Sequence, residues 1–237
     1  MGNDVSVFGG KVNVADVKGL AAKAKEAAQN NPRGGGPAGS DYLNFSGKKG
    51  IFTIGVDNRQ IENDELWIVD VTSFEEGWIC WKGGKPASTR LSNIYSGLPV
   101  MAPNPEDGGP FNQSKGEGWF QAKAMVLKSL EHDQQGYLKL NSISGVSSMA
   151  ELIGAFADRA VSTEEVWPVI RLDVEEFEAQ GFKNYKPVFD VVGWLTAEQL
   201  QEVAEGADVG DFLELEDEPE PEPVKPAPKA ITGRRRG

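Results

Sequence analysis

Residues 119–141, WFQAKAMVLKSLEHDQQGYLKLN, decide the fold that we expect. Two runs with alternating polar and apolar residues, 119–127 and 136–141, flank the polar turn Asp133-Gln-Gln-Gly136, and this pattern predicts a β-hairpin. Because strand side chains alternate between faces, the first run divides into two sets. The set assigned to the core is Phe120, Ala122, Ala124 and Val126, and the opposite set is Trp119, Gln121, Lys123 and Met125. The second run places Tyr137, Lys139 and Asn141 on one face, so the hairpin could present both aromatic–lysine pairs outward.

Similar short β-type segments precede and follow this hairpin. They cover residues 50–56, 65–71, 77–82, 167–172 and 186–192, and Gly83-Gly-Lys-Pro86 supplies turn chemistry after the third. Residues 147–161 have the spacing of a helix that packs on the sheet, capped by Ser147 or Ser148 with Glu151 close behind. Its apolar face would be Met149, Leu152, Ile153, Phe156 and Ala160. A short helix is expected over 196–205, and the Pro/Gly-rich segment 92–117 should be a functional or mobile loop.

These elements predict a mainly β (β-rich α+β) fold. The leading candidate is an OB-like, five-stranded Greek-key barrel with an inserted helix, and a plain β-sandwich is the alternative. We expect three segments in the chain. Residues 1–40 would form an N-terminal arm, with a helix over 16–29 and a Gly/Pro linker; 41–207 the β-rich body; and 208–237 a disordered, acidic, Pro-rich tail that ends in Arg234-Arg-Arg-Gly237.

The net charge of −12 argues against a duplex DNA binder that depends on bulk positive charge, and against adhesion to anionic membranes. The charge is uneven along the chain. Residues 42–141 hold 10 Lys and Arg against 12 Asp and Glu, whereas residues 150–210 hold 4 against 13. A surface that binds a polyanion should therefore lie on the first part of the body.

The chain lacks the residues that most catalytic and metal-binding sites require. Cys80 is the only cysteine, which excludes an intrachain disulfide and a cysteine metal cage, and the only histidine, His132, lies in a predicted solvated turn. Neither Gly/Lys cluster, 46–50 or 83–86, has the spacing of a phosphate-binding loop. We therefore expect no enzyme activity and no cofactor, although an enzyme built on carboxylates and a divalent ion stays a minor alternative. The absence of a membrane-spanning run or signal peptide leads us to expect a soluble, cytoplasmic protein.

Aromatic residues interleaved with Lys and Arg suggest a grip on single-stranded nucleic acid, because rings stack on unpaired bases while cations follow the phosphates. The candidates for this role are Lys48, Lys49, Trp78, Trp81, Lys82, Lys85, Arg90, Trp119, Lys123, Tyr137 and Lys139. Parity allows only one of Trp78 and Trp81 to share a face with Lys82. In the alternative interpretation these aromatics are core residues, as we expect for Trp167, Phe189 and Trp194.

The chain resembles phage-encoded single-stranded DNA-binding proteins. The resemblance lies in a β-rich body with interleaved Trp, Tyr and Lys, a Gly/Pro-rich loop, an acidic tail, and segments such as Phe74-Glu-Glu-Gly-Trp-Ile-Cys-Trp-Lys-Gly-Gly-Lys-Pro86 and Asn184-Tyr-Lys-Pro-Val-Phe-Asp-Val-Val-Gly-Trp194. It implies an OB-type body that binds single-stranded DNA during replication or recombination in the host cytoplasm, with oligomerisation allowed. It also implies recruitment of replication or recombination proteins by the tail, although the family's tails usually end acidic or aromatic, whereas this one ends in arginines. The competing hypothesis is a phage structural or protein-interaction protein that does not bind nucleic acid.

Overall fold

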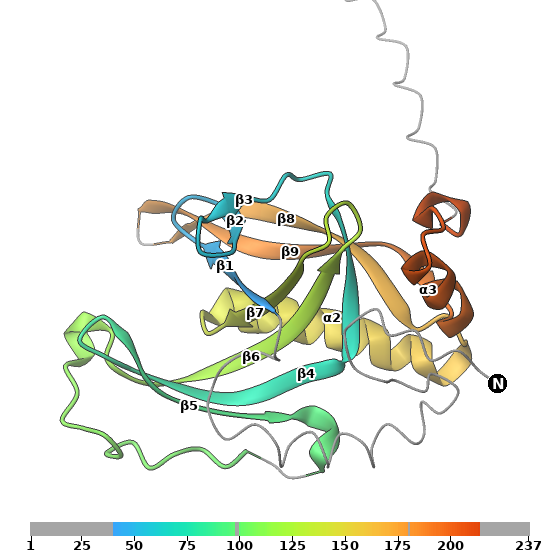
Figure 1. The fold of residues 1–237 in the computed structure, drawn as a ribbon. Helices are drawn as coiled ribbons and strands as arrows, with labels where there is room; N and C mark the ends of the chain where they lie inside the picture. Colours follow the sequence, from blue (N-terminus) through green and yellow to red (C-terminus); the bar gives the residue numbers. More distant parts are fainter. Residues whose placement is uncertain (1–39, 98–99, 180, 214–237) are drawn as a thin grey trace, which may run out of the picture.

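The computed structural model describes residues 40–97, 100–179 and 181–213, which fold as a curled β-sheet with helices packed against it (Figure 1). The strands are β1 (Asp41–Ser46), β2 (Ile51–Ile54), β3 (Arg59–Gln60), β4 (Leu66–Lys82), β5 (Lys85–Asn93), β6 (Gly118–Ser129), β7 (Gln135–Leu140), β8 (Trp167–Ala179) and β9 (Phe182–Leu195). The helices are α2 (Ile143–Ser162) and α3 (Ala197–Ala204), with 3-10 turns η1 (Ile94–Ser96), η2 (Gln113–Lys115) and η3 (Val209–Asp211). The helix expected over 16–29 and the acidic tail from residue 214 onward lie outside the described residues.

The strands form one sheet in the order β3-β2-β1-β7-β6-β4-β8-β9, and β5 pairs with β4 outside that path. The β1–β7 pair is parallel, and the other pairs are antiparallel. The sheet is curled, and the curl brings β9 to the β1–β2 turn, where the backbone N–H of Tyr185 donates to the carbonyl of Gly47 at 2.8 Å. The predicted β-rich class is confirmed, and a single curled sheet replaces the two stacked sheets of the sandwich alternative.

Strand β4 was expected as two strands, 65–71 and 77–82, but it is one bent strand of 17 residues. Asp70 pairs with Val126 and Glu75 with Ala124, so the four residues between Asp70 and Glu75 bulge out of register with β6. Side chains hold the bulge: the Ser73 hydroxyl accepts from the Val126 N–H at 2.8 Å and donates to the Asp70 carbonyl at 2.6 Å. Bulges bend a strand. The first half of β4 can therefore pair with β8 while the second half pairs with β5.

The main core lies between the inner face of the sheet and α2. Its largest fully buried side chains include Trp67, Phe74, Met125, Leu127, Leu138, Met149, Trp167 and Ile170. The apolar stripe predicted for the helix is confirmed, since Met149, Leu152 and Phe156 are buried. The helix begins a turn earlier than expected, however, because Ser142 is its N-cap and accepts from the Gly145 N–H at 3.1 Å.

The core assignment of three further aromatic residues is also confirmed. Trp167 is buried, and Phe189 and Trp194 pack against the core from β9. His132 is exposed in the β6–β7 turn, as its polar neighbours indicated.

The body ends later than the boundary expected at residue 207. Leu213 is only 7% exposed, and Val209 and Phe212 pack against the core beside it. Packing is close, because a Cβ added to Gly193 of β9 would lie 2.4 Å from Leu213 Cδ2. In the described part of the chain, no helix is both long and apolar enough to cross a bilayer.

Candidate nucleic-acid interface

Two hairpin arms extend from the same side of the sheet, and the N-terminal end of α2 lies between them (Figure 1). The first arm is the distal half of β4 with β5 and the start of β6, residues 75–93 and 118–124. The second arm is the distal part of the β8–β9 hairpin, residues 173–179 and 181–190. The surface is hollowed on both sides of the helix end, by about 170 Å³ next to the first arm and about 470 Å³ next to the second.

Strand pairing brings sequence-distant candidates onto one face of the first arm. Gly83 and Gly84, with φ of +62° and +73°, allow the tight two-residue turn between β4 and β5. Directly paired residues project from the same face of a sheet. Trp78 is paired with Arg90, and Cys80 is paired with Trp119. Trp78, Arg90 and Trp119 therefore share a face, and alternation along β4 adds Lys82 to it.

Two of the cations on this face already contact aromatic rings. The Arg90 guanidinium carbon lies 4.7 Å from the centroid of the Trp119 ring, and the Lys82 ammonium lies 5.8 Å from the centroid of Phe111. Both distances are within the range of cation–π attraction. Three predicted binding residues, Arg90, Trp119 and Lys82, thus take part in cation–ring contacts, although the pairs differ from those expected and Phe111 was not among the predicted residues.

Part of the long loop between η1 and β6 lies against this cluster. We call residues 104–111 the strap. The Trp119 indole N–H donates to the carbonyl of Asp107 at 2.9 Å, and the Lys82 ammonium donates to the carbonyl of Gly108 at 2.7 Å. The Asp107 carboxylate also pairs with Arg90 at 3.3 Å. The loop expected to be functional or mobile is therefore in contact with three of the predicted binding residues.

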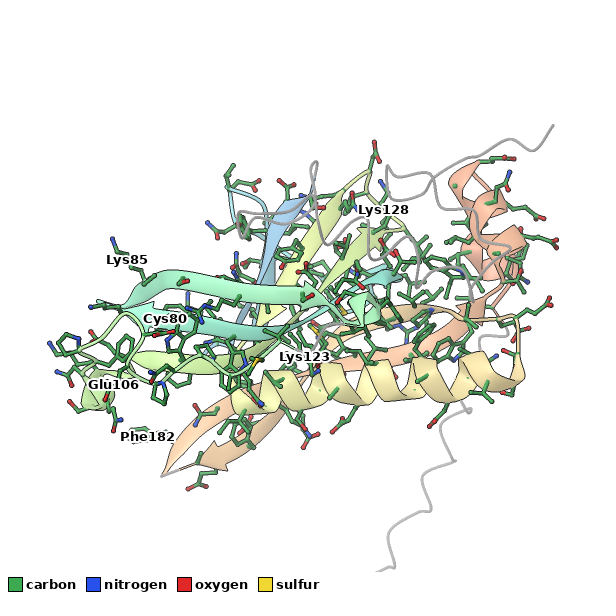
Figure 2. All side chains as sticks on the ribbon, turned by 90° about the horizontal axis from the view of Figure 1, so that it is seen from below. Cys80, Lys85, Glu106, Lys123, Lys128 and Phe182 are labelled. Carbon is green, nitrogen blue, oxygen red and sulfur yellow. The ribbon has the colours of Figure 1, made fainter. Side chains whose placement is uncertain are left out.

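The remaining lysine candidates are divided between exposed turns and ion pairs. Lys48 and Lys49 are exposed in the β1–β2 turn, and Lys85 is exposed at the tip of the first arm (Figure 2). Among the described residues none of these three lysines has an ion-pair partner. Lys123 differs, because its ammonium pairs with Glu76 at 2.9 Å beside the hollow between the first arm and α2.

Two predicted residues, Tyr137 and Lys139, lie on the opposite face of the sheet from Trp119 and Lys123, so the proposed joint platform is wrong. Lys123 pairs with Leu140, whereas Lys139 pairs with Ala124. Tyr137 is only 5% exposed and donates its hydroxyl hydrogen to Glu75 Oε2 at 2.6 Å. Burial raises the pKa of Tyr137 and of Glu75 and lowers the pKa of Lys139. A ring sealed in this way cannot stack on a base.

The error has a physical origin in the packing of β6. Ala122, Ala124 and Val126 are buried as predicted, but Phe120, which was assigned to the same core face, is 36% exposed near the start of β6. Ala124 and Val126 belong to a small second cluster with Tyr137, against which Leu91 packs. Met125, on the opposite face, is buried in the main core. Other side chains therefore cover both faces of β6 around residues 124–126. The alternation of polar and apolar residues in the sequence does not show whether a face is covered.

Trp81 also lies on the face opposite to Trp78 and Lys82, in keeping with the parity argument. It is paired with Gly118, is only partly exposed, and its indole nitrogen is buried without a hydrogen-bond partner among the described residues. Of the two tryptophans in this strand, Trp78 is therefore the one that shares a face with the cations, and it lines the hollow next to α2.

Two exposed aromatic residues of the second arm, Phe177 and Phe182, were not predicted as site residues from the sequence. They are 36% and 72% exposed, and Phe182 lies at the end of the second arm (Figure 2). Phe177 lines the larger hollow together with Ile143 of α2 and Lys186 of β9. The available signal was Phe177, which is flanked by glutamates in a stretch without other large apolar residues on its face. It was overlooked because residues 150–210 are rich in acidic residues, so the polyanion site was expected in the first part of the body.

The geometry of the described residues does not support the alternative of an enzyme built on carboxylates and a divalent ion. Within the described residues, no group of three or more His, Cys, Asp or Glu side chains is placed to hold a metal ion. No protein-family model matches the chain, and no curated protein or solved structure matches it either. Function is therefore inferred from the residues and geometry of this chain.

Proposed function

We propose that this protein binds single-stranded DNA without enzymatic activity and with little sequence preference, in phage replication or recombination in the host cytoplasm. The observation that carries the proposal is the shared face of the first arm, where Arg90 lies over Trp119 and where Trp78 and Lys82 project from the same face. Aromatic faces next to cations suit unpaired bases joined by phosphates.

The connectivity of the sheet supports an OB-like body. If β1–β3 and β5 are set aside, the chain runs β4, β6, β7, α2, β8, β9, with β4 paired to both β6 and β8. A five-stranded Greek-key barrel of the oligonucleotide-binding type has this arrangement, with its helix between the third and fourth strands. The two arms then correspond to the loops after the first and fourth barrel strands, and in that fold these loops contact the oligonucleotide.

The charges favour a single strand over a duplex. Lys48, Lys49 and Lys85 have no carboxylate partners in the described part of the chain. The Lys82 ammonium donates to carbonyl groups and lies near a ring, and it forms no ion pair among the described residues. Because few cations are available, the protein would neutralise few phosphates. Charge alone would therefore bind a duplex only weakly. Base stacking, which requires unpaired bases, adds about 1–3 kcal/mol per base.

Tryptophan fluorescence titration with oligothymidine at low salt tests the proposal. We expect saturable quenching with the single strand and little response to a duplex of equal length. No quenching with the oligonucleotide in large excess would remove the proposal. A defined partner protein, together with a hydrodynamic size that nucleic acid leaves unchanged, would then favour the protein-interaction hypothesis.

A pair of matched variants localises the site. Trp119→Leu removes the ring under Arg90, so the loss of one stacking partner should weaken binding about 5- to 150-fold. Trp194→Leu is the control, because Trp194 carries an equivalent cation, Arg159 at 5.1 Å, near the C-terminal end of α2. Equal losses in both variants would mean that the effect is structural and does not come from the first arm.

A further inference from the structure

The strap places on the first arm the chemical groups that a single strand would bring. Trp119 and Lys82 each donate to a strap carbonyl, and Arg90 pairs with a strap carboxylate. The carbonyl oxygens of the strap accept hydrogen bonds that base or sugar oxygens of a bound strand would otherwise accept. The Asp107 carboxylate occupies the position next to Arg90 that a phosphate of the strand would take. The strap thus uses the hydrogen-bonding capacity that the proposed ligand needs.

The strap is attached by contacts that can be exchanged. It belongs to no strand, and turns within it are closed by the Asp107 N–H on the Asn104 carbonyl and the Gly109 N–H on the Glu106 carbonyl, both at 2.9 Å. The Arg90–Asp107 pair is solvent-exposed on both sides, at 47% and 45%. Exposed pairs of this kind contribute little. The Arg90–Asp107 pair therefore adds little to the attachment of the strap.

The loop is fixed more firmly on the C-terminal side of the strap. Glu117 accepts from the Gly83 N–H at 3.0 Å and from the Asn112 N–H at 2.9 Å, which ties the loop to the β4–β5 turn. These two backbone donors lower the pKa of the Glu117 carboxyl. Movement of the strap would then pivot about this attachment while the tip of the arm keeps its shape.

We propose that the strap is an internal competitor that covers the Arg90–Trp119–Lys82 cluster in the free protein and is displaced by single-stranded DNA. This inference rests on the proposed function and adds a regulatory step to the same site. Weak or short anions would leave the strap in place, whereas a strand that contacts several sites at once would remove it.

The first test compares two neutralised carboxylates in the same loop. Asp107→Asn removes the carboxylate that pairs with Arg90, whereas Glu106→Gln removes an equal charge that has no ion-pair partner in the described residues. Figure 2 places Glu106 in the same loop. Loss of an exposed ion pair should strengthen oligothymidine binding about two- to fivefold in Asp107→Asn relative to Glu106→Gln. Equal affinities of the two variants would overturn the competition by Asp107.

The second test locks the strap with the protein's own cysteine. A Cβ added at Gly108 would lie 4.0 Å from the Cys80 sulfur, so a Gly108→Cys variant can form a disulfide after a small adjustment. The φ of Gly108 is +83°, and the strain of a side chain there is shared by the Gly108→Ser control. We expect the oxidised Gly108→Cys protein, with no titratable thiol, to bind oligothymidine at least tenfold more weakly than the same protein after reduction. The Gly108→Ser control should not respond to the reductant.

The outcomes separate the two proposals. If the wild-type protein binds but strap locking and Asp107→Asn change nothing, the strap proposal fails and the proposed function stands. If the wild-type protein does not bind but reduced Gly108→Cys or Asp107→Asn does, the strap is a strong competitor. If none of these proteins binds, both proposals are overturned.

Discussion

Replacing Asp70 by asparagine should stabilise the protein at neutral pH, because burying the charged carboxylate of Asp70 destabilises the folded state. Asp70 is 8% exposed and lies at the β4 bulge, where its Oδ1 accepts from the Thr72 N–H at 3.0 Å and from the Thr72 hydroxyl at 2.6 Å. Desolvation raises the pKa of Asp70 from 3.8 to about 6, and the two bonds from Thr72 oppose the rise only in part.

The direction of the pH dependence follows from the protons held by the two states. Between about pH 4 and pH 6 the folded protein keeps a proton on Asp70 that the unfolded chain has lost, so stability falls as pH rises through this window. The stabilisation is complete below pH 3.8 and is lost above about pH 6. A difference of about two pKa units corresponds to about 3 kcal/mol. The amide of Asp70→Asn carries no charge and can still accept from Thr72, so the gain at pH 8 should be about 1–3 kcal/mol.

Urea unfolding of wild type and Asp70→Asn at pH 4, 6 and 8 measures this effect. The two proteins should have similar free energies of unfolding at pH 4 and should diverge as pH rises. Asp133→Asn is a control of opposite sign, because the ammonium of Lys128 lowers the pKa of the exposed Asp133 carboxyl and its charge therefore favours the fold at higher pH. An Asp70→Asn protein that is equally stable or less stable than wild type at pH 8 would refute the reasoning.

Three further changes test the first arm, the core and the β1–β2 turn. Gly77→Ala should disrupt the β4–β5 pair and cost more than about 2 kcal/mol in urea unfolding, because the new Cβ would lie 2.0 Å from a β5 carbonyl oxygen at a φ of +152°. Phe74→Ala, at a site with 0% exposure, should cost about 3–5 kcal/mol by the same measurement. If Lys48 and Lys49 each contact a phosphate, replacing both by Glu should lower the slope of log affinity against log salt by about 1.4. Lys128→Glu, in the β6–β7 hairpin away from the tips of the arms, should leave that slope unchanged (Figure 2).

The parts of the fold that were predictable are those whose sequence pattern matches their burial. The β6–β7 hairpin follows from alternation around a polar turn, and α2 follows from an apolar stripe whose residues Met149 and Phe156 are buried. Its start was displaced because Ser142 caps the helix, although Ser147 and Ser148 had the same chemistry in sequence. Choosing among three serines requires knowing where the preceding strand ends.

The elements that were missed lack an apolar alternation of their own and are held in place by their partners. Strand β5, with the sequence KPASTRLSN, lacks an apolar alternation and is half-exposed or exposed along its length. It forms because β4 offers a free edge after a two-glycine turn. The polar stretch from Thr72 to Glu76 suggested a loop for a related reason, since its bulge is held by side-chain bonds such as that of the Asn93 amide to the Thr72 carbonyl at 2.6 Å.

For the candidate site, residue types were predictable but their exposure and partners were not. Parity correctly placed Trp78 and not Trp81 beside Lys82, since it depends only on one strand. It failed for Tyr137, because whether a face is open depends on what packs over it. The Asp107 carboxylate on Arg90 was likewise invisible, since it joins residues 17 positions apart across an irregular loop.

If the protein binds single-stranded DNA as proposed, the two arms contribute differently, because their lysines differ in their ion-pair partners. In the second arm Lys183 pairs with Glu176 at 2.5 Å and Lys186 with Glu175 at 2.8 Å, so this arm offers the rings of Phe177 and Phe182 more readily than free cations. In the first arm Lys85 has no ion-pair partner among the described residues, and under the strap proposal Lys82 and Arg90 become available once the strap leaves. Of the two arms, only the first would therefore supply phosphate contacts, and the second would supply stacking. Removing the phenylalanine rings of the second arm should lower affinity without changing the salt dependence.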